Sequence, residues 1–188
     1  MADSSGIAFT NVEGQLPSYS GVVAANAGYA TPTDLVVLQN PAPSGVIVRL
    51  IQVRFLAVAT AASFFDAFLQ KRIQLDTGGT ATVVTPTVHD TNDGAAKALF
   101  QFYTVAPTLN GSATNVRTKK AFLAAAGTPV LQDETVWQWG ERSIRAPHAR
   151  PGEQFALNFA GAGLPAGFSG YITFEWSESG INTQTQQF

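Results

Sequence analysis

The 188-residue sequence contains no cysteine, which excludes disulfides, thiol catalysis and cysteine-ligated metals. Charged residues are also scarce: they make up 13% of the chain, against ~25% in a typical soluble domain. Ser, Thr, Asn, Gln and Gly take their place. A surface with so little charge gains little from electrostatic repulsion against association. The composition therefore predicts either a surface largely covered by other protein or simply a neutral, polar β-protein.

Patterns of export, membrane insertion and nucleic-acid binding are missing as well. Residues 1–21 lack a basic segment followed by an apolar one, so we expect no signal peptide. The most apolar run, residues 46–69, is interrupted by four charged or polar residues, which favours a pair of buried strands over a membrane span. The formal net charge is -2, and the basic pairs at 71–72 and 119–120 are too short for a nucleic-acid-binding stripe.

Alternation of apolar and polar residues dominates the sequence and predicts strands. Phe155, Leu157 and Phe159 would share one face of a strand, with polar or small residues on the other. Turn-forming Gly, Pro, Asn and Asp clusters separate about nine such segments: 34–39, 46–58, 63–72, 81–86, 98–105, 119–124, 134–139, 155–159 and 171–176. Residues 92–99 fit a short helix or the start of a strand. We predict an all-β fold, an antiparallel β-sandwich or jelly roll.

The two ends differ in composition from the centre. Residues 1–30 are rich in Gly, Ala and Ser and predict an extended N-terminal arm, and residues 177–188 predict a short polar C-terminal tail. The β-sandwich domain would then span residues 31–176. Such compositions are equally typical of disordered ends. The alternative is that a neighbouring subunit holds both segments, Phe188 included.

Catalytic and metal-binding constellations are not recognisable in the sequence. His89 and His148 are the two histidines, and neither follows a nucleophile elbow, so we predict no enzymatic activity. Asp90, Asn92 and Asp93 resemble the start of a calcium loop but are one residue short of the required spacing. They predict an Asx-rich turn instead. No cofactor or metal is expected.

Residues 136–159 combine tryptophans, arginines, acids and a histidine around a predicted strand edge. Trp137 and Trp139 would face the same way, into the core, toward a protein partner or toward a sugar ring. Arginines, acids and aromatic residues at a strand edge are also what an oligomer contact uses. We therefore predict an interface made by Trp139, Glu141, Arg142, Arg145, His148, Arg150 and Phe188. An ordinary solvated turn with surface ion pairs is the alternative.

Four segments resemble small structural proteins of tailed bacteriophages: 32–50, 89–104, 136–161 and 171–178. The resemblance covers about residues 31–178, and its motifs are structural rather than chemical. Capsid decoration (cement) proteins are the most similar in size and composition. The resemblance implies a homo-oligomer, most often a trimer, made in the host cytoplasm and bound to the major capsid protein on the capsid surface. It leaves open a tail or head–tail connector role, or host attachment in which Trp137, Trp139 or Tyr103 stacks on sugar rings.

Overall fold

Strands occupy most of the computed structural model, which describes residues 16–26, 33–127, 134–140, 145–160 and 165–181. In chain order they are β1 (Ser18–Asn26), β2 (Asp34–Gln39), β3 (Val46–Ala59), β4 (Ser63–Arg72), β5 (Thr80–Val84), β6 (Thr87–Val88), β7 (Leu99–Val105), β8 (Ala113–Ala125), β9 (Thr135–Gln138), β10 (His148–Ala149), β11 (Gln154–Ala160) and β12 (Ser169–Gly180). A short 3-10 helix, Ala42–Ser44, precedes β3. The predicted all-β fold is confirmed, and residues 92–99 form turns that lead into β7. Among the described helices, none has the length and apolar character to cross a membrane.

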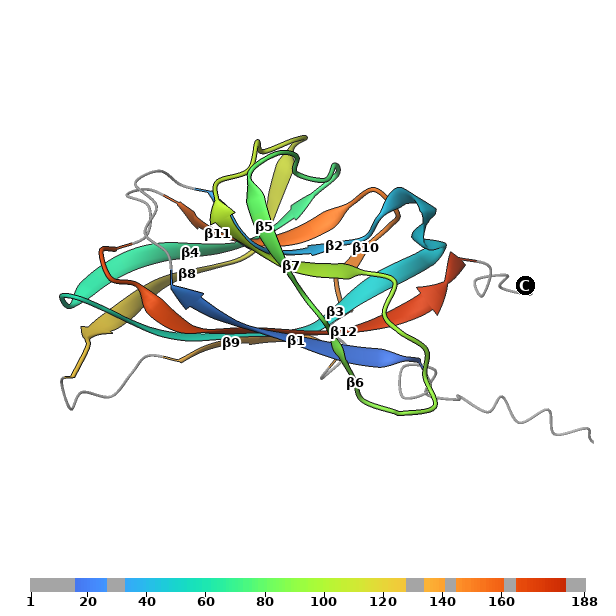
Figure 1. The fold of residues 1–188 in the computed structure, drawn as a ribbon, viewed down its shortest axis with the longest axis horizontal. Helices are drawn as coiled ribbons and strands as arrows, with labels where there is room; N and C mark the ends of the chain where they lie inside the picture. Colours follow the sequence, from blue (N-terminus) through green and yellow to red (C-terminus); the bar gives the residue numbers. More distant parts are fainter. Residues whose placement is uncertain (1–15, 27–32, 128–133, 141–144, 161–164, 182–188) are drawn as a thin grey trace, which may run out of the picture.

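The described strands form one curled sheet in the order β5-β7-β2-β11-β4-β8-β3-β12-β1-β6, with β9 and β10 added beside β3 (Figure 1). Neighbours are antiparallel except β3 and β8, which run parallel where Val58 pairs with Ala124 and Ala59 with Ala125. The expectation of a purely antiparallel sheet was therefore wrong. In the sheet, β8 lies between β4 and β3. The chain reverses direction from β3 to β4, and β8 is antiparallel to β4, so β8 runs in the same direction as β3.

The 14-residue strand β3 is the common element of the sheet. One of its edges pairs with β12 along almost its whole length. Its other edge is shared in turn by β10 at residues 48–49, β9 at residues 52–55 and β8 at residues 58–59. Its alternating pattern of buried side chains, which include Leu50, Val53 and Phe55, faces the interior.

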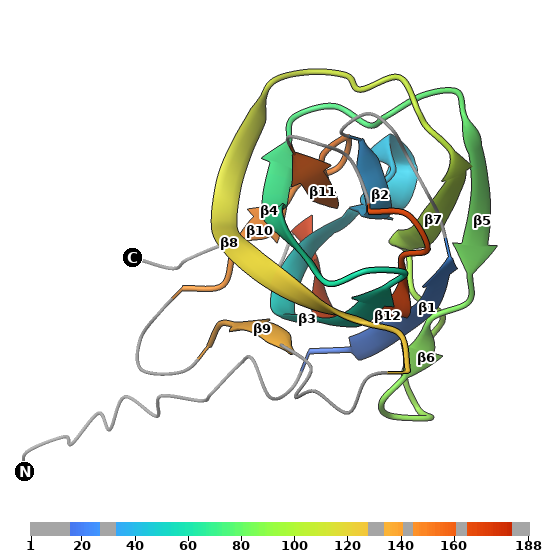
Figure 2. The same cartoon turned by 90° about the vertical axis from the view of Figure 1, so that its left-hand side faces the viewer.

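Curling brings the two ends of the sheet together around a single aromatic core (Figure 2). Phe159 from β11 lies 5.0 Å from Phe65 and 6.2 Å from Phe55 between ring centroids, so it joins the two halves of the sheet. At the seam between β1 and β7, the ring of Phe100 lies where a side chain at Gly21 would point. Glycine is required at position 21 because a Cβ atom there would collide with this ring, which packs closely against the β1 backbone.

Two central strands are buried on both faces. Every residue of β2 is buried, as are residues 154–159 of β11. The face of β11 that carries Gln154, Ala156 and Asn158 is therefore buried as well as its apolar face. Loop segments after β4 and β7 lie over that face, and Gln154 and Asn158 are buried beneath them in hydrogen bonds.

The sheet extends beyond the predicted limits of the sandwich domain. Residues 18–26, assigned to the N-terminal arm, form β1, which pairs with β12 through nine residue pairs from Ser18–Ser177 to Asn26–Ser169. Residues 177–180, assigned to the C-terminal tail, complete β12. Small residues conceal β1 in the sequence because Gly21 and Ala25 occupy positions where larger apolar residues would signal a strand.

We expect Phe159→Ala to lower the free energy of unfolding by about 3–5 kcal/mol, since it leaves a cavity among three aromatic rings. Urea denaturation followed by tryptophan fluorescence measures this change. The matched control is Phe64→Ala, in which the lost ring is 69% exposed; its cost should be below about 1 kcal/mol. Equal losses in the two variants would contradict the placement of Phe159 at the centre of the core.

Candidate functional site

Apolar side chains form a continuous band on the outside of the sheet. The band crosses five neighbouring strands, β4, β8, β3, β12 and β1, near one end of the molecule. Phe64 is paired in register with Phe122, Leu56 with Tyr171, and Tyr171 with Ala24. The short β3–β8 junction, two residues beyond Phe122, connects the two parts of the band. We call this surface the outer apolar band; its members are Val22, Ala24, Leu56, Val58, Phe64, Phe122 and Tyr171.

The band combines exposed aromatic side chains with a hollow in the surface. The side chains of Phe64, Tyr171 and Val22 are 69%, 65% and 52% exposed. The rings of Phe64 and Phe122 stack against each other with centroids 5.2 Å apart. Next to Tyr171 lies a hollow of about 290 Å³, whose lining includes Leu56. An exposed apolar surface of this kind is typical of a site that contacts another macromolecule.

Two exposed ion pairs border the band. Lys120 Nζ lies 3.1 Å from Asp66 Oδ1 beside the phenylalanine pair. On the other side of the β3–β8 junction, Arg54 Nη2 lies 2.7 Å from Glu134 Oε1. An apolar centre with a charged, solvated rim is the usual anatomy of a protein–protein interface.

Four members of the interface predicted from the sequence lie within the described residues: Trp139, Arg145, His148 and Arg150. Trp139 is 4% exposed, and its indole ring lies under the guanidinium group of Arg117, 5.3 Å from Cζ to the ring centroid. Arg145 and Arg150 are exposed, while His148 is half-buried in β10. These residues lie beside β9 and β10 and outside the outer apolar band, and their interface role stays a prediction. Glu141, Arg142 and Phe188 lie outside the described residues.

Glu153 organises the turn that follows β10. Its carboxylate accepts a hydrogen bond from the Arg150 backbone N–H at 2.7 Å and pairs with Lys71 Nζ at 2.8 Å. Burial works to raise the pKa of Glu153, but these two contacts hold it below its usual range. For His148, burial and the nearby charges of Lys71 and Arg150 lower the pKa, so the imidazole is neutral at pH 7. Residues 150–153 form a turn in which the Glu153 backbone N–H donates to the Arg150 carbonyl at 2.9 Å.

The aromatic residues suggested for sugar stacking face the interior. Trp137, Trp139 and Tyr103 are 8%, 4% and 3% exposed. None of these three rings can stack on a sugar without a rearrangement of the core. Among the described residues, the large exposed aromatic side chains are those of Phe64 and Tyr171 in the outer apolar band.

The Asx-rich turn after β6 is confirmed. Asp90 Oδ1 accepts hydrogen bonds from the backbone N–H and the side-chain amide of Asn92, at 2.9 and 3.0 Å. His89 Nδ1 lies 3.3 Å from Ser18 Oγ, which ties this turn to β1. In the part of the chain that the structure describes, no group of three His, Asp or Glu side chains is placed to hold a metal ion.

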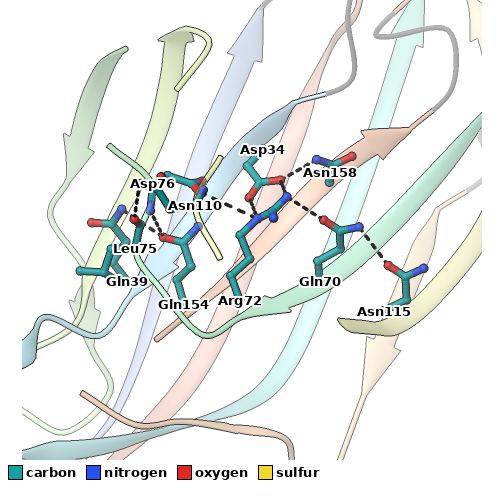
Figure 3. A network of polar contacts seen from close by, with 10 residues as sticks. All are labelled: Asp34, Gln39, Gln70, Arg72, Leu75, Asp76, Asn110, Asn115, Gln154 and Asn158. Atoms are coloured by element: carbon teal, nitrogen blue, oxygen red, sulfur yellow. Dashed lines mark hydrogen bonds and ion pairs between the residues drawn. The ribbon is translucent and has the colours of Figure 1, made fainter. Parts of the chain in front are cut away.

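A buried polar cluster, which the sequence did not predict, lies on the outer side of the sheet away from the outer apolar band (Figure 3). The loops that follow β4 and β7 cover it. Arg72 Nε donates to Asp34 Oδ2 at 2.6 Å and Nη2 donates to Asp34 Oδ1 at 3.1 Å, a two-point contact. Asn158 Nδ2 also donates to Asp34 Oδ1. Side-chain hydrogen bonds continue from Arg72 through Gln70 to Asn115.

A second carboxylate, that of Asp76, enters the same cluster from the loop after β4. Its Oδ1 lies 3.9 Å from Arg72 Nε and accepts the Asn110 backbone N–H at 3.3 Å. Burial, together with the negative charge of Asp34, raises the pKa of Asp76 to about 7. For Arg72, burial acts to lower the pKa, but the hydrogen bond and charge of Asp34 raise it overall, so Arg72 stays charged.

The sequence held a weak signal for the outer apolar band and little for the polar cluster. Phe64 and Phe68 sit on the predicted outer face of a strand, where alternation would place polar residues. Asp34, Arg72 and Asp76 lie in or beside strands with no spacing that would bring them together. Pairing between distant strands creates that cluster.

No protein-family model, curated protein or solved structure matches this chain. Function must therefore be argued from the geometry.

We expect Arg72→Met to lower the free energy of unfolding by about 3–5 kcal/mol, because it leaves Asp34 buried without its cation. The matched control, Arg54→Met, removes the arginine of the exposed Arg54–Glu134 ion pair. It should lower the free energy of unfolding by no more than about 1 kcal/mol. Urea denaturation of both variants at pH 7 makes the comparison. A loss below about 1 kcal/mol for Arg72→Met would show that the buried pair contributes little.

Proposed function

We propose that this chain is a non-enzymatic structural protein of a virion, which binds the capsid of a tailed bacteriophage as a decoration (cement) protein and uses the outer apolar band as its contact surface. The observation that carries this proposal is the band itself. It places two exposed aromatic side chains, Phe64 and Tyr171, on a rigid sheet among smaller apolar neighbours. Aromatic side chains in such a setting are the residues that most often dominate binding between polypeptides.

The fold supports a mechanical role of this kind. The band lies on ladder-paired strands rather than on loops, so its side chains are fixed before a partner arrives and little entropy is lost on binding. We propose that the curled sheet is organised as a β-sandwich, in which the strands from β5 to β8 in the sheet order form one layer and those from β3 to β6 form the other, joined by two residue pairs. The resemblance of residues 31–178 to decoration proteins is consistent with this arrangement.

Self-association belongs to the same proposal. Decoration proteins act as homo-oligomers, and we propose a trimer. In a trimer three copies of the band would bind together, so that modest contacts add through effective concentration. The arginines and histidine at 145–150 remain available for contacts between subunits, because they lie outside the band.

We expect Phe64→Ala and Tyr171→Ala each to weaken binding to purified capsids by about 30-fold, the effect of losing a contact worth ~2 kcal/mol. Co-sedimentation with capsids over a range of protein concentrations measures the affinity. The matched control is Ile73→Ala, since Ile73 is 58% exposed but lies outside the band. The affinity of this variant for capsids should be unchanged.

The outcome against this proposal is equally specific. Unaltered binding in both aromatic variants would remove the band from the interface. Absence of the chain from purified virions, measured by mass spectrometry, would remove the virion role itself. Hundreds of copies per particle would identify decoration, whereas about a dozen would identify a connector or tail component.

A further inference from the structure

The buried polar cluster has more negative than positive charge. The side chains of Asp34, Arg72 and Asp76 are almost completely buried, with Asp34 at 0% exposure. Two carboxylates thus face one guanidinium group, and the other residues hydrogen-bonded to Asp34 and Asp76 are neutral: Asn158, Gln154 and Asn110. With both carboxylates ionised, the cluster would hold one uncompensated negative charge away from water. Such a charge is strongly unfavourable, and uptake of a proton removes it.

The geometry shows where that proton fits. Asp76 Oδ1 already accepts the Asn110 backbone N–H, whereas Asp76 Oδ2 is buried and has no partner among the described residues. Arg72 Nε lies 2.6 Å from Asp34 Oδ2 and 3.9 Å from Asp76 Oδ1, so one guanidinium group holds the two carboxyl groups close together. Two carboxyl groups can form a hydrogen bond with each other when one of them carries a proton. A proton on Asp76 Oδ2 would therefore satisfy an orphaned atom and remove the excess charge at once.

Asp76 also connects two loops to the sheet. Its backbone N–H donates to Gln154 Oε1 of β11 at 3.0 Å. In the second loop, Asn110 Nδ2 donates to the Leu75 carbonyl at 3.1 Å and to Thr77 Oγ1 at 2.9 Å. Thr77 and Thr108 exchange two backbone hydrogen bonds, at 3.2 and 2.7 Å, so segments 73–79 and 106–112 form one unit. The backbone N–H of Asp76 holds this unit to β11, and the carboxyl group of Asp76 adds the contact with Arg72 at the end of β4.

We propose that a proton shared between Asp76 and Asp34 latches segments 73–79 and 106–112 onto the outer face of the sheet, and that loss of this proton loosens both segments. The latch is a pH-sensitive device separate from the outer apolar band. Its opening gives solvent access to the buried polar side chains that the two segments contact, Gln154 of β11 and Arg72 of β4.

The direction of the pH effect follows from the two states of Asp76. In the open state its carboxyl group has the ordinary pKa of 3.8, and in the closed state the pKa is raised to about 7. Between these values the closed state binds the proton and the open state does not. Closure is therefore strongest at acidic pH, weakens as pH rises through this window, and is constant above it.

The other charged and titratable groups facing Asp76 do not change over this range. Arg72 of β4 remains protonated, and burial together with the charges of Asp76 and Asp34 raises the pKa of Tyr103 of β7, which keeps it neutral. Neither β11 nor segment 106–112 contains a titratable side chain. The titration thus belongs to the pair of carboxyl groups, with Asp34 supplied by β2.

Hydrogen–deuterium exchange of the whole chain between pH 5 and pH 8 tests the latch. After correction for intrinsic exchange, the protection of amides in segments 73–79 and 106–112 should fall on the order of 100-fold over this range. Asp76→Asn, which keeps the shape but cannot ionise, should remove this pH dependence. The matched control Asp66→Asn changes an exposed aspartate and should behave as the original chain does. Protection that is independent of pH, or that titrates unchanged in Asp76→Asn, would overturn the proposal.

A second measurement does not depend on a variant that folds. The carboxyl carbon of Asp76, observed by nuclear magnetic resonance in the unaltered protein, should titrate with a midpoint near pH 7. A midpoint near pH 4 would show that Asp76 shares no proton with Asp34, and would overturn the latch even if the loops were found to move.

Discussion

Both halves of the sheet depend on the backbone of β3. One of its edges binds β12 along almost its whole length, and the other is divided among β10, β9 and β8. Because β8 reaches β3 through two residue pairs alone, the sheet turns sharply at that point and closes over its own core. The same junction joins the strand that carries Phe122 to the strand that carries Leu56. The contact that closes the core also assembles the outer apolar band.

Curling has a second consequence, which concerns polar groups. Where loops cover the outside of β2 and β11, side chains that would face water in an open sheet become buried, and each needs a partner. Arg72 and Asp34 are each other's partners in a two-point ion pair, and Asn158 donates a further hydrogen bond to Asp34. Asp76 adds a second carboxylate to the cluster, whereas the single positive charge of Arg72 balances only one. A buried carboxyl group placed in this way responds to pH as a direct result of its position.

Local alternation was sufficient to predict most strands but not how they pair. Segments 46–58 and 63–72 correspond to β3 and β4, which carry most of their buried residues at every second position, and segment 34–39 corresponds to β2, a short apolar run that is buried throughout. β1 escaped detection because its inward positions include Gly21, whose small size is explained only by the ring of Phe100 opposite. The parallel β3–β8 pairing, the outer apolar band and the Asp34–Asp76 pair all depend on contacts between distant strands, which periodicity does not encode.

The band and the latch lie on different parts of one rigid scaffold, and this separation matters for how they act. The phenylalanines of the band sit on β4 and β8 near the β3 junction, whereas the cluster occupies the far end of β4 at Arg72. A change in protonation at Asp76 moves loops that contact β2 and β11, and the ladder between β4 and β8 need not move with them. Under the two proposals, the band keeps its contact with a partner while the loops respond to pH, because the paired strands β4 and β8 lie between the two regions.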